Sequence, residues 1–282
     1  MSATHEGPAI GPIVGVTLST PDLEASEAAY VSALGYRLGA RGRISVADAQ
    51  SWGSQAMAGA RFICVHPQAS ADFHFRIIES PACKGYRAFT SHGWNAAELI
   101  VEDVDALAKE LAGSPFEILG PPQDLSFTDA IRAMQVRGPG GEILYLTQFK
   151  RQLAGLPAPP ARCKVDRVFI VIVGGQSLDT LLDFYSNTYN VPMPQRMESR
   201  VKAMSEAFGL SPEHRYAIAA LPLRGNCYIE ADQMPEMAKP AVRAPGMLPP
   251  GISIVTMSTP GSALCGCVTG PAGELIEIVE AA

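Results

Sequence analysis

The sequence predicts an α+β protein built from four strand–helix–strands units, the last of them truncated. The first observation is a phrase that occurs twice, as GPGGEILYL at 138–146 and as GPAGELIEI at 270–278. Each copy is a Gly/Pro turn that leads into an apolar strand and closes one half of the sequence. This spacing indicates a duplicated domain, because solenoid repeats recur every 20–50 residues or so. The second observation is that a strand followed by an amphipathic helix begins again several times along the chain.

The first unit opens with an apolar strand at 14–19. A helix follows, with Asp22 or Thr20 as its N-cap, and Gly35 suits the left-handed position after its end. Strands are predicted at 61–65 and 72–78. In the second of these, alternation places Phe73, Phe75 and Ile77 on one face and His74, Arg76 and Ile78 on the other.

The same pattern defines the remaining units. The second has a strand at 96–101, a helix that begins at Asp103, and strands at 133–136 and 142–147. A Pro-rich stretch at 156–160 then marks a boundary. The third unit has a strand at 165–171, a helix and a strand at 227–231, and the fourth has a strand at 252–257 but no predicted helix. We therefore expect a two-module domain at 1–150, a linker at 151–164 and a second two-module domain at 165–282.

Composition excludes several classes of function. The chain has 282 residues, of which 47% are hydrophobic and 18% charged, and a net charge of −6. An acidic chain without a basic stripe is not expected to bind nucleic acid, and no apolar run reaches the ~20 residues that span a bilayer. The N-terminus lacks a signal-peptide pattern, and the six cysteines include no CxxC pair. We expect a cytoplasmic protein with reduced thiols. Its expected partner is a small-molecule substrate, and a second copy of the chain is the other candidate partner.

Several phrases, taken in order, resemble the vicinal-oxygen-chelate superfamily, which includes glyoxalase I, extradiol dioxygenases and bleomycin-resistance proteins. Residues 14–23 are similar to its first strand and helix start, and Tyr30 with Leu-Gly-Tyr at 34–36 is similar to the phrase that follows. Residues 101–107 and both Gly-Pro-x-Gly-Glu strands also match. The resemblance implies βαβββ modules paired into two glyoxalase-like domains, each with a U-shaped mixed sheet around a cleft.

The resemblance also implies where a divalent metal would bind. The family takes His, Gln or Glu ligands from first and last strands of the modules. Transferred to this chain, the first-strand positions are Gly15, Ala96, Arg167 and Ser253, and the last-strand positions are Arg76, Tyr145, Glu230 and Glu277. These residues make a poor ligand set, because iron and zinc favour imidazoles or several carboxylates and a guanidinium repels a cation. We expect no metal and no other cofactor, with one divalent ion such as Fe or Mn as the alternative.

In the C-terminal cleft, Arg167 and Glu277 are expected to be neighbours and catalytic. Arg167 would hold a carboxylate or enolate, and Glu277, with its pKa raised by an apolar cleft, would transfer a proton. The alternative is a buried ion pair that holds the sheet together. Glu230 fits either arrangement, and Ser253 and Tyr228 complete the expected substrate-binding residues on this side.

In the N-terminal cleft, Tyr145 is the expected catalytic residue and Arg76 and His74 the expected binding residues. A tyrosine hydroxyl beside an arginine can polarise a carbonyl group, and a histidine there can act as acid or base. The alternative is that Tyr145 merely fills a degenerate cleft, which the sequence favours.

Three functions follow from these residues. The leading one is a metal-independent lyase, isomerase or hydratase that acts on a small, hydrophobic or aromatic-derived compound with a carboxylate or carbonyl group. The second is an extradiol-type ring-cleaving dioxygenase, which the four-module length suggests. The third is a non-catalytic protein that binds a small hydrophobic molecule, which the methionine-rich C-terminal half suggests.

Overall fold

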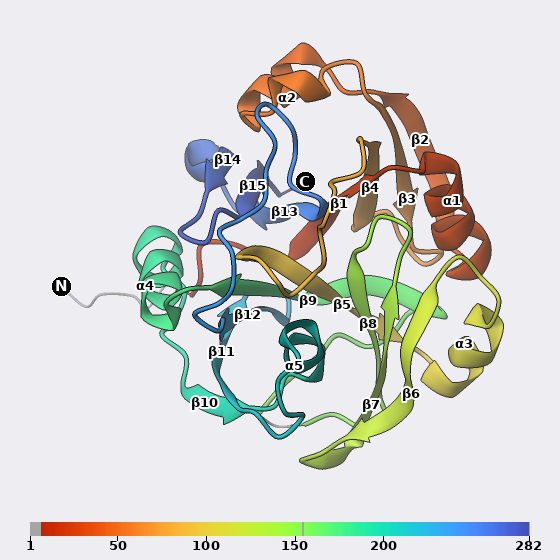
Figure 1. Ribbon diagram of the computed structural model, residues 1–282, viewed down its shortest axis with the longest axis vertical. Helices are drawn as coiled ribbons and strands as arrows, with labels where there is room; N and C mark the ends of the chain where they lie inside the picture. Colours follow the sequence, from red (N-terminus) through yellow and green to blue (C-terminus); the bar gives the residue numbers. More distant parts are fainter. Residues whose placement is uncertain (1–6, 154, 282) are drawn as a thin grey trace.

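The structure is a computed structural model that describes residues 7–153 and 155–281. Its strands form two curled mixed sheets, one above the other in Figure 1. The upper sheet has seven strands in the order β14-β15-β13-β1-β4-β3-β2. Their bounds are β1 Ile13–Thr20, β2 Arg37–Arg43, β3 Arg61–His66, β4 His74–Glu79, β13 Gly251–Thr259, β14 Gly266–Thr269 and β15 Leu275–Glu280.

The lower sheet has eight strands in the order β10-β11-β12-β9-β5-β8-β7-β6. Their bounds are β5 Gly93–Val101, β6 Glu117–Leu125, β7 Thr128–Arg137, β8 Ile143–Phe149, β9 Val165–Gly175, β10 Arg196–Ser199, β11 Tyr216–Leu223 and β12 Cys227–Gln233. The helices are α1 Leu23–Glu27, η1 Ala28–Ala33, α2 Val46–Ser51, η2 Gln55–Met57, α3 Val104–Leu111, α4 Leu178–Tyr189, α5 Lys202–Phe208 and η3 Ser262–Leu264.

The sheets pair the modules differently from the expected grouping into two halves. The seven-stranded sheet joins the first module to the fourth through β1 and β13, and the eight-stranded sheet joins the second to the third through β5 and β9. Residues 1–150 and 165–282 therefore do not each form a separate sheet. β1 pairs antiparallel with β13, and β5 pairs antiparallel with β9. An amphipathic pattern shows which face of a strand is buried but not which strand lies beside it. The pairing of the modules therefore could not be read from the sequence.

Three apolar clusters define the layers. One cluster lies between the convex faces of the two sheets and includes residues of η1, α3 and α4. A second fills much of the concave face of the eight-stranded sheet, where Met204 of α5 packs near Ile170 and Ile172; Figure 1 shows α5 inside this curve. A third lies on the concave face of the seven-stranded sheet and includes Ala49 of α2 and Trp52. Each concave face is thus partly covered by a short helix that the sequence did not predict.

The repeated phrase forms the same turn twice. In the first copy the backbone N–H of Gly138 donates to the carbonyl of Glu142 (2.9 Å), and in the second Gly270 donates to Glu274 (2.8 Å). The Glu142 carboxylate folds back over Gly138, where a Cβ would lie 1.9 Å from its Oε1. Only glycine can occupy that position without moving the carboxylate.

Each repeated glutamate also binds a tyrosine from a helix of the other sheet's module. Tyr30 in η1 donates to Glu142 (3.0 Å), and Tyr185 in α4 donates to Glu274 (3.1 Å). All four side chains are buried, and burial raises the pKa of both glutamates to about 7. These two hydrogen bonds connect the seven-stranded to the eight-stranded sheet, once in each direction.

We expect Tyr30→Phe and Tyr185→Phe each to lower the free energy of unfolding by about 1–3 kcal/mol, because each leaves a buried carboxyl group without its donor. The double variant should lose about the sum, since the two sites share no partner. Urea denaturation monitored by circular dichroism measures this loss. Losses below about 0.5 kcal/mol in both single variants, the range of neutral surface substitutions, would contradict a role in joining the sheets.

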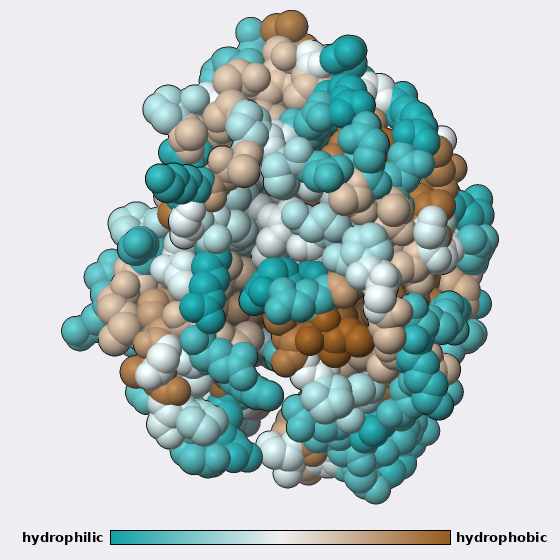
Figure 2. Space-filling model, turned by 45° about the vertical axis from the view of Figure 1, so that its right-hand side comes forward, coloured by the Kyte–Doolittle hydropathy of each residue, from teal (hydrophilic) through white to brown (hydrophobic). Residues whose placement is uncertain are grey.

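In the view of Figure 2, polar residues surround a compact apolar region just below the middle of the face. Within residues 7–153 and 155–281, no helix has the length and apolar character needed to cross a membrane.

Candidate functional site

The register between paired parallel strands shows which first-strand residue lies beside each predicted last-strand ligand position. Arg76 of β4 lies beside Thr17 of β1, not Gly15, and Glu277 of β15 lies beside Thr256 of β13, not Ser253. In the other sheet Tyr145 of β8 lies beside Glu98, not Ala96, and Glu230 of β12 lies beside Ile172, not Arg167. The four corrected first-strand positions are Thr17, Glu98, Ile172 and Thr256.

Arg76 and Glu277 meet in the cleft of the seven-stranded sheet. Their side chains form an ion pair with Nη2 of Arg76 at 3.0 Å from Oε2 of Glu277, and they remain only 16% and 18% exposed. Arg76 Nε donates to the Thr17 hydroxyl at 2.9 Å, and its guanidinium lies 4.5 Å from the centroid of the Trp52 ring. The expected arginine partner of Glu277 was Arg167, so this part of the prediction is wrong.

Both carboxylate oxygens of Glu277 are bonded in this cleft. Trp52 Nε1 donates to Oε1 (3.0 Å), and the Thr256 hydroxyl donates to Oε2 (2.7 Å). Burial raises the pKa of Glu277, but Arg76 and these donors outweigh it, so the pKa lies below its usual value. The expected rise in this pKa does not occur. A carboxylate that is ionised, fully bonded and covered by Trp52 has the geometry of a structural ion pair.

Two other residues of this sheet that were predicted to bind substrate already contact other parts of the protein. His74 covers Gly15, where a Cβ would lie 2.7 Å from its Cε1, and burial together with Arg76 and His66 lowers its pKa to about 4. His74 is therefore neutral at physiological pH. Ser253 is fully buried, 2.8 Å from the Ser19 hydroxyl, and donates to the Pro249 carbonyl at 2.6 Å.

Arg167 and Tyr228 belong to the eight-stranded sheet. Arg167 lies at the start of β9, where its Nη1 is 3.4 Å from a carboxylate oxygen of Asp72. It is therefore far along the sheet from Glu230, which pairs with Ile172. The Tyr228 hydroxyl donates to the carbonyl of Pro157 (3.1 Å) and ties β12 to the Pro-rich stretch.

The cleft of the eight-stranded sheet contains acidic groups with few partners. Glu98 and Tyr145 are register neighbours on β5 and β8, and the Thr147 hydroxyl donates to Glu98 at 2.7 Å. Glu230 lies two strands away on β12, and all three of Glu98, Tyr145 and Glu230 are half-buried. Asp232, two residues further along β12, is fully buried, and neither of its carboxylate oxygens has a hydrogen-bond partner in the described residues.

Burial shifts the three acids of this cleft and Tyr145 toward their neutral forms. Burial raises the pKa of Glu98 to about 7, and burial together with the charge of Glu98 raises that of Glu230 to about 7. The pKa of Asp232 is raised well above its usual value by burial and by Glu230. The pKa of Tyr145 is shifted upward by burial and by these acids, so its hydroxyl stays protonated. Unsatisfied and shifted acids of this kind are typical of functional sites.

A small cavity opens beside Tyr145. Its volume is about 90 Å³, and its wall also includes Gln135, the register partner of Tyr145 on β7, and Lys202 of α5. Tyr145 therefore lines this cavity and also lies close enough to the acids for their charges to raise its pKa.

Neither cleft fits a resident divalent metal. The four ligand positions hold Thr17, Arg76, Thr256 and Glu277 in one sheet, and Glu98, Tyr145, Ile172 and Glu230 in the other. The first set places a guanidinium where a cation would bind, and the second offers two carboxylates without an imidazole. Across residues 7–153 and 155–281, no three His, Cys, Asp or Glu side chains converge in a way that could bind an ion.

The fold is similar to two solved structures over nearly the whole chain. A mutant of glyoxalase I from Zea mays aligns with a TM-score of 0.66 at 12% identity, over 98% of this chain and 94% of that one. A putative dioxygenase from Bacillus subtilis aligns with a TM-score of 0.59 at 10% identity, over 97% and 85%. No protein-family model and no curated protein sequence matches the chain. The chain has the vicinal-oxygen-chelate fold, which confirms the predicted fold and its two U-shaped mixed sheets.

Proposed function

We propose that the protein is an enzyme that transfers a proton within a small carbonyl-bearing molecule, as an isomerase or lyase, in the cleft of the eight-stranded sheet and without a resident metal. The observation that carries this proposal is the pair Glu98 and Glu230, whose pKa values both lie at about 7. Because the charge of Glu98 raises the pKa of Glu230, ionisation of Glu98 favours the protonated form of Glu230 near neutral pH.

The residues of this cleft would divide the reaction as follows. The ionised carboxylate of the pair removes a proton from the carbon next to the substrate carbonyl, and the electron pair of that C–H bond moves toward the carbonyl oxygen. Tyr145, which stays protonated, donates a hydrogen bond to the oxygen as it gains negative charge. The protonated carboxyl group then gives a proton to a second carbon, which completes an isomerisation, or to a leaving group, which completes an elimination.

This proposal can be tested before the natural substrate is known. The protein is incubated in D₂O with a panel of small aldehydes, ketones and hydroxyketones, and deuterium incorporation next to the carbonyl is measured by proton NMR. Proton removal exchanges the label even when no net product forms. We expect at least one compound to exchange faster with the protein than with buffer alone. Absence of exchange across the panel, with saturable binding of the same compounds, would favour a non-catalytic binding protein.

We expect chelation to leave this exchange unchanged, because neither cleft has a ligand set for a divalent ion. Dialysis against EDTA followed by the exchange assay and by thermal denaturation tests this, with metal content measured before and after. Activity lost on dialysis and restored by iron or manganese would contradict the proposal and favour a ring-cleaving dioxygenase.

A further inference from the structure

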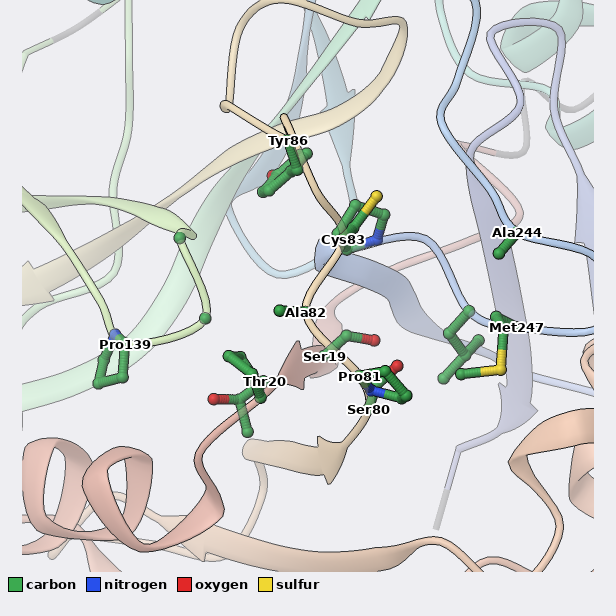
Figure 3. A pocket seen from close by; sticks show the side chains of 15 residues that line it. Ser19, Thr20, Ser80, Pro81, Ala82, Cys83, Tyr86, Pro139, Ala244 and Met247 are labelled. Carbon is green, nitrogen blue, oxygen red and sulfur yellow. The ribbon is translucent and has the colours of Figure 1, made fainter.

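A cavity of about 460 Å³ lies outside the proposed catalytic cleft, at the C-terminal ends of β1 and β4. Its walls come from four segments far apart in the sequence, at 19–21, 80–86, 139–141 and 244–250. Figure 3 shows Tyr86 and Cys83 on one side, Thr20 and Ser80 on the opposite side, and Met247 to the right. The cavity therefore lies where the ends of two central strands of the seven-stranded sheet meet the turn before β8.

The lining is apolar with a few hydroxyl groups, and it includes no Asp, Glu, Lys, Arg or His. The hydroxyls of Ser19 and Thr20 are already bonded, to Ser253 (2.8 Å) and Ser26 (2.7 Å). In the described part of the chain, no hydrogen bond joins the hydroxyls of Ser80 or Tyr86 to another residue. The wall thus presents two hydroxyls that can bond a ligand, while an ionised ligand would leave water without finding a counter-charge.

The wall is held in place by contacts of its own. The Tyr86 side chain packs against Gly251 and Gly141, where added Cβ atoms would lie 2.1 Å from its hydroxyl oxygen and 3.3 Å from its ring. The connector at 244–250 is anchored by Arg243, which donates to the carbonyls of Trp52 (2.9 Å) and Met247 (2.8 Å). A cavity whose walls are fixed before binding needs little ordering when a ligand enters.

We propose that this cavity is a second binding site, which takes an uncharged, flat carbonyl or ester compound with an apolar body. The apolar body lies against the prolines, Met247 and Leu248, and the carbonyl oxygen accepts hydrogen bonds from the hydroxyls of Ser80 and Tyr86. This site does not depend on the chemistry proposed for Glu98 and Glu230, because none of its walls contains either residue.

The test compares two ligands of nearly the same shape by isothermal titration calorimetry, methyl 2-naphthoate and the 2-naphthoate anion. We expect the ester to bind saturably to the full chain and at least tenfold more tightly than the anion. Ala82→Trp, which adds a large side chain near the centre of Figure 3, should abolish binding. Lys84→Trp, on the same loop but outside the cavity wall, should bind normally.

A double variant, Ser80→Ala with Tyr86→Phe, removes only the two hydroxyls and should weaken ester binding at least tenfold while the fold is retained by circular dichroism. Glu230→Gln should bind the ester as the unaltered protein does, which separates this site from the catalytic proposal. Failure of the ester to saturate, equal binding of the anion, or full binding by Ala82→Trp would each overturn the assignment.

Discussion

Replacing Glu230 by glutamine is expected to slow deuterium exchange by about 10²–10⁴-fold, the usual contribution of a general acid or base. The amide keeps the shape of the side chain but cannot carry a proton between substrate atoms. Glu98→Gln should have an effect of similar size, because the proposed reaction uses one carboxyl group as the base and the other as the acid. The double variant should lose little more than either single variant, since residues that act as a unit are not additive.

The matched control is Glu236→Gln, which makes the same chemical change at an exposed glutamate and should retain full activity. Stability provides an independent check on Glu230→Gln. Because the folded pKa is raised to about 7, the glutamate's contribution to stability is present below its unfolded pKa and is lost as the pH rises through 7. The free energy of unfolding of the variant, relative to that of the unaltered protein, should therefore be higher at pH 8 than at pH 5. Unchanged exchange in a folded Glu230→Gln protein would remove this residue from the mechanism.

The second large effect concerns the ion pair in the other sheet. Arg76→Met is expected to lower the free energy of unfolding by about 3 kcal/mol, because it leaves the carboxylate of Glu277 mostly buried without its cation. Glu277→Leu combined with Arg76→Met should recover most of that loss, since the charge that needs a partner is then absent. Guanidinium denaturation of the parent and the two variants measures both values. A single variant as stable as the parent would show that the pair has no structural role.

The pH dependence of this pair has the opposite sign to that of Glu230. The pKa of Glu277 is lowered in the folded state, so the pair stabilises the protein above the usual glutamate pKa. That stabilisation is lost as the pH falls through the lowered value. The difference in stability between the parent and the double variant should therefore be largest near neutral pH and shrink on acidification.

The fold could be predicted because it depends on patterns that lie close together in the sequence. The turn before β8 and β15 is encoded in each copy of Gly-Pro-x-Gly-Glu, and Asp22 and Asp103 cap their helices as expected. The truncated fourth module was also predicted, since only the short helix η3 separates β13 from β14 in the described residues. The sequence did not predict α2 or α5, which cover the two clefts and lack a long apolar stripe.

The site could be predicted only in part, because it depends on register between strands that are distant in the sequence. Tyr145 and Glu230 were identified on their strands, but their neighbours were not, since the first strands carry irregularities. In β5, Glu98 lies two residues after the expected position Ala96 and therefore on the same face, but the sequence did not show which of the two lies beside Tyr145. Asp232 could have been found as the next residue on the Glu230 face, two positions along β12. The pairing of Glu277 with Arg76 required knowledge of which modules share a sheet.

The most direct test of the account is an infrared titration of the carboxyl groups in the unaltered protein between pH 5 and pH 9. We expect a carboxyl signal that titrates with a midpoint of about 7, and that is reduced in Glu98→Gln and in Glu230→Gln but not in Glu236→Gln. The buried Glu142 and Glu274 titrate in the same range, so their signal should remain in both cleft variants. Signals unchanged by either cleft substitution would mean that neither Glu98 nor Glu230 titrates between pH 5 and pH 9, and would contradict the proposed proton transfer.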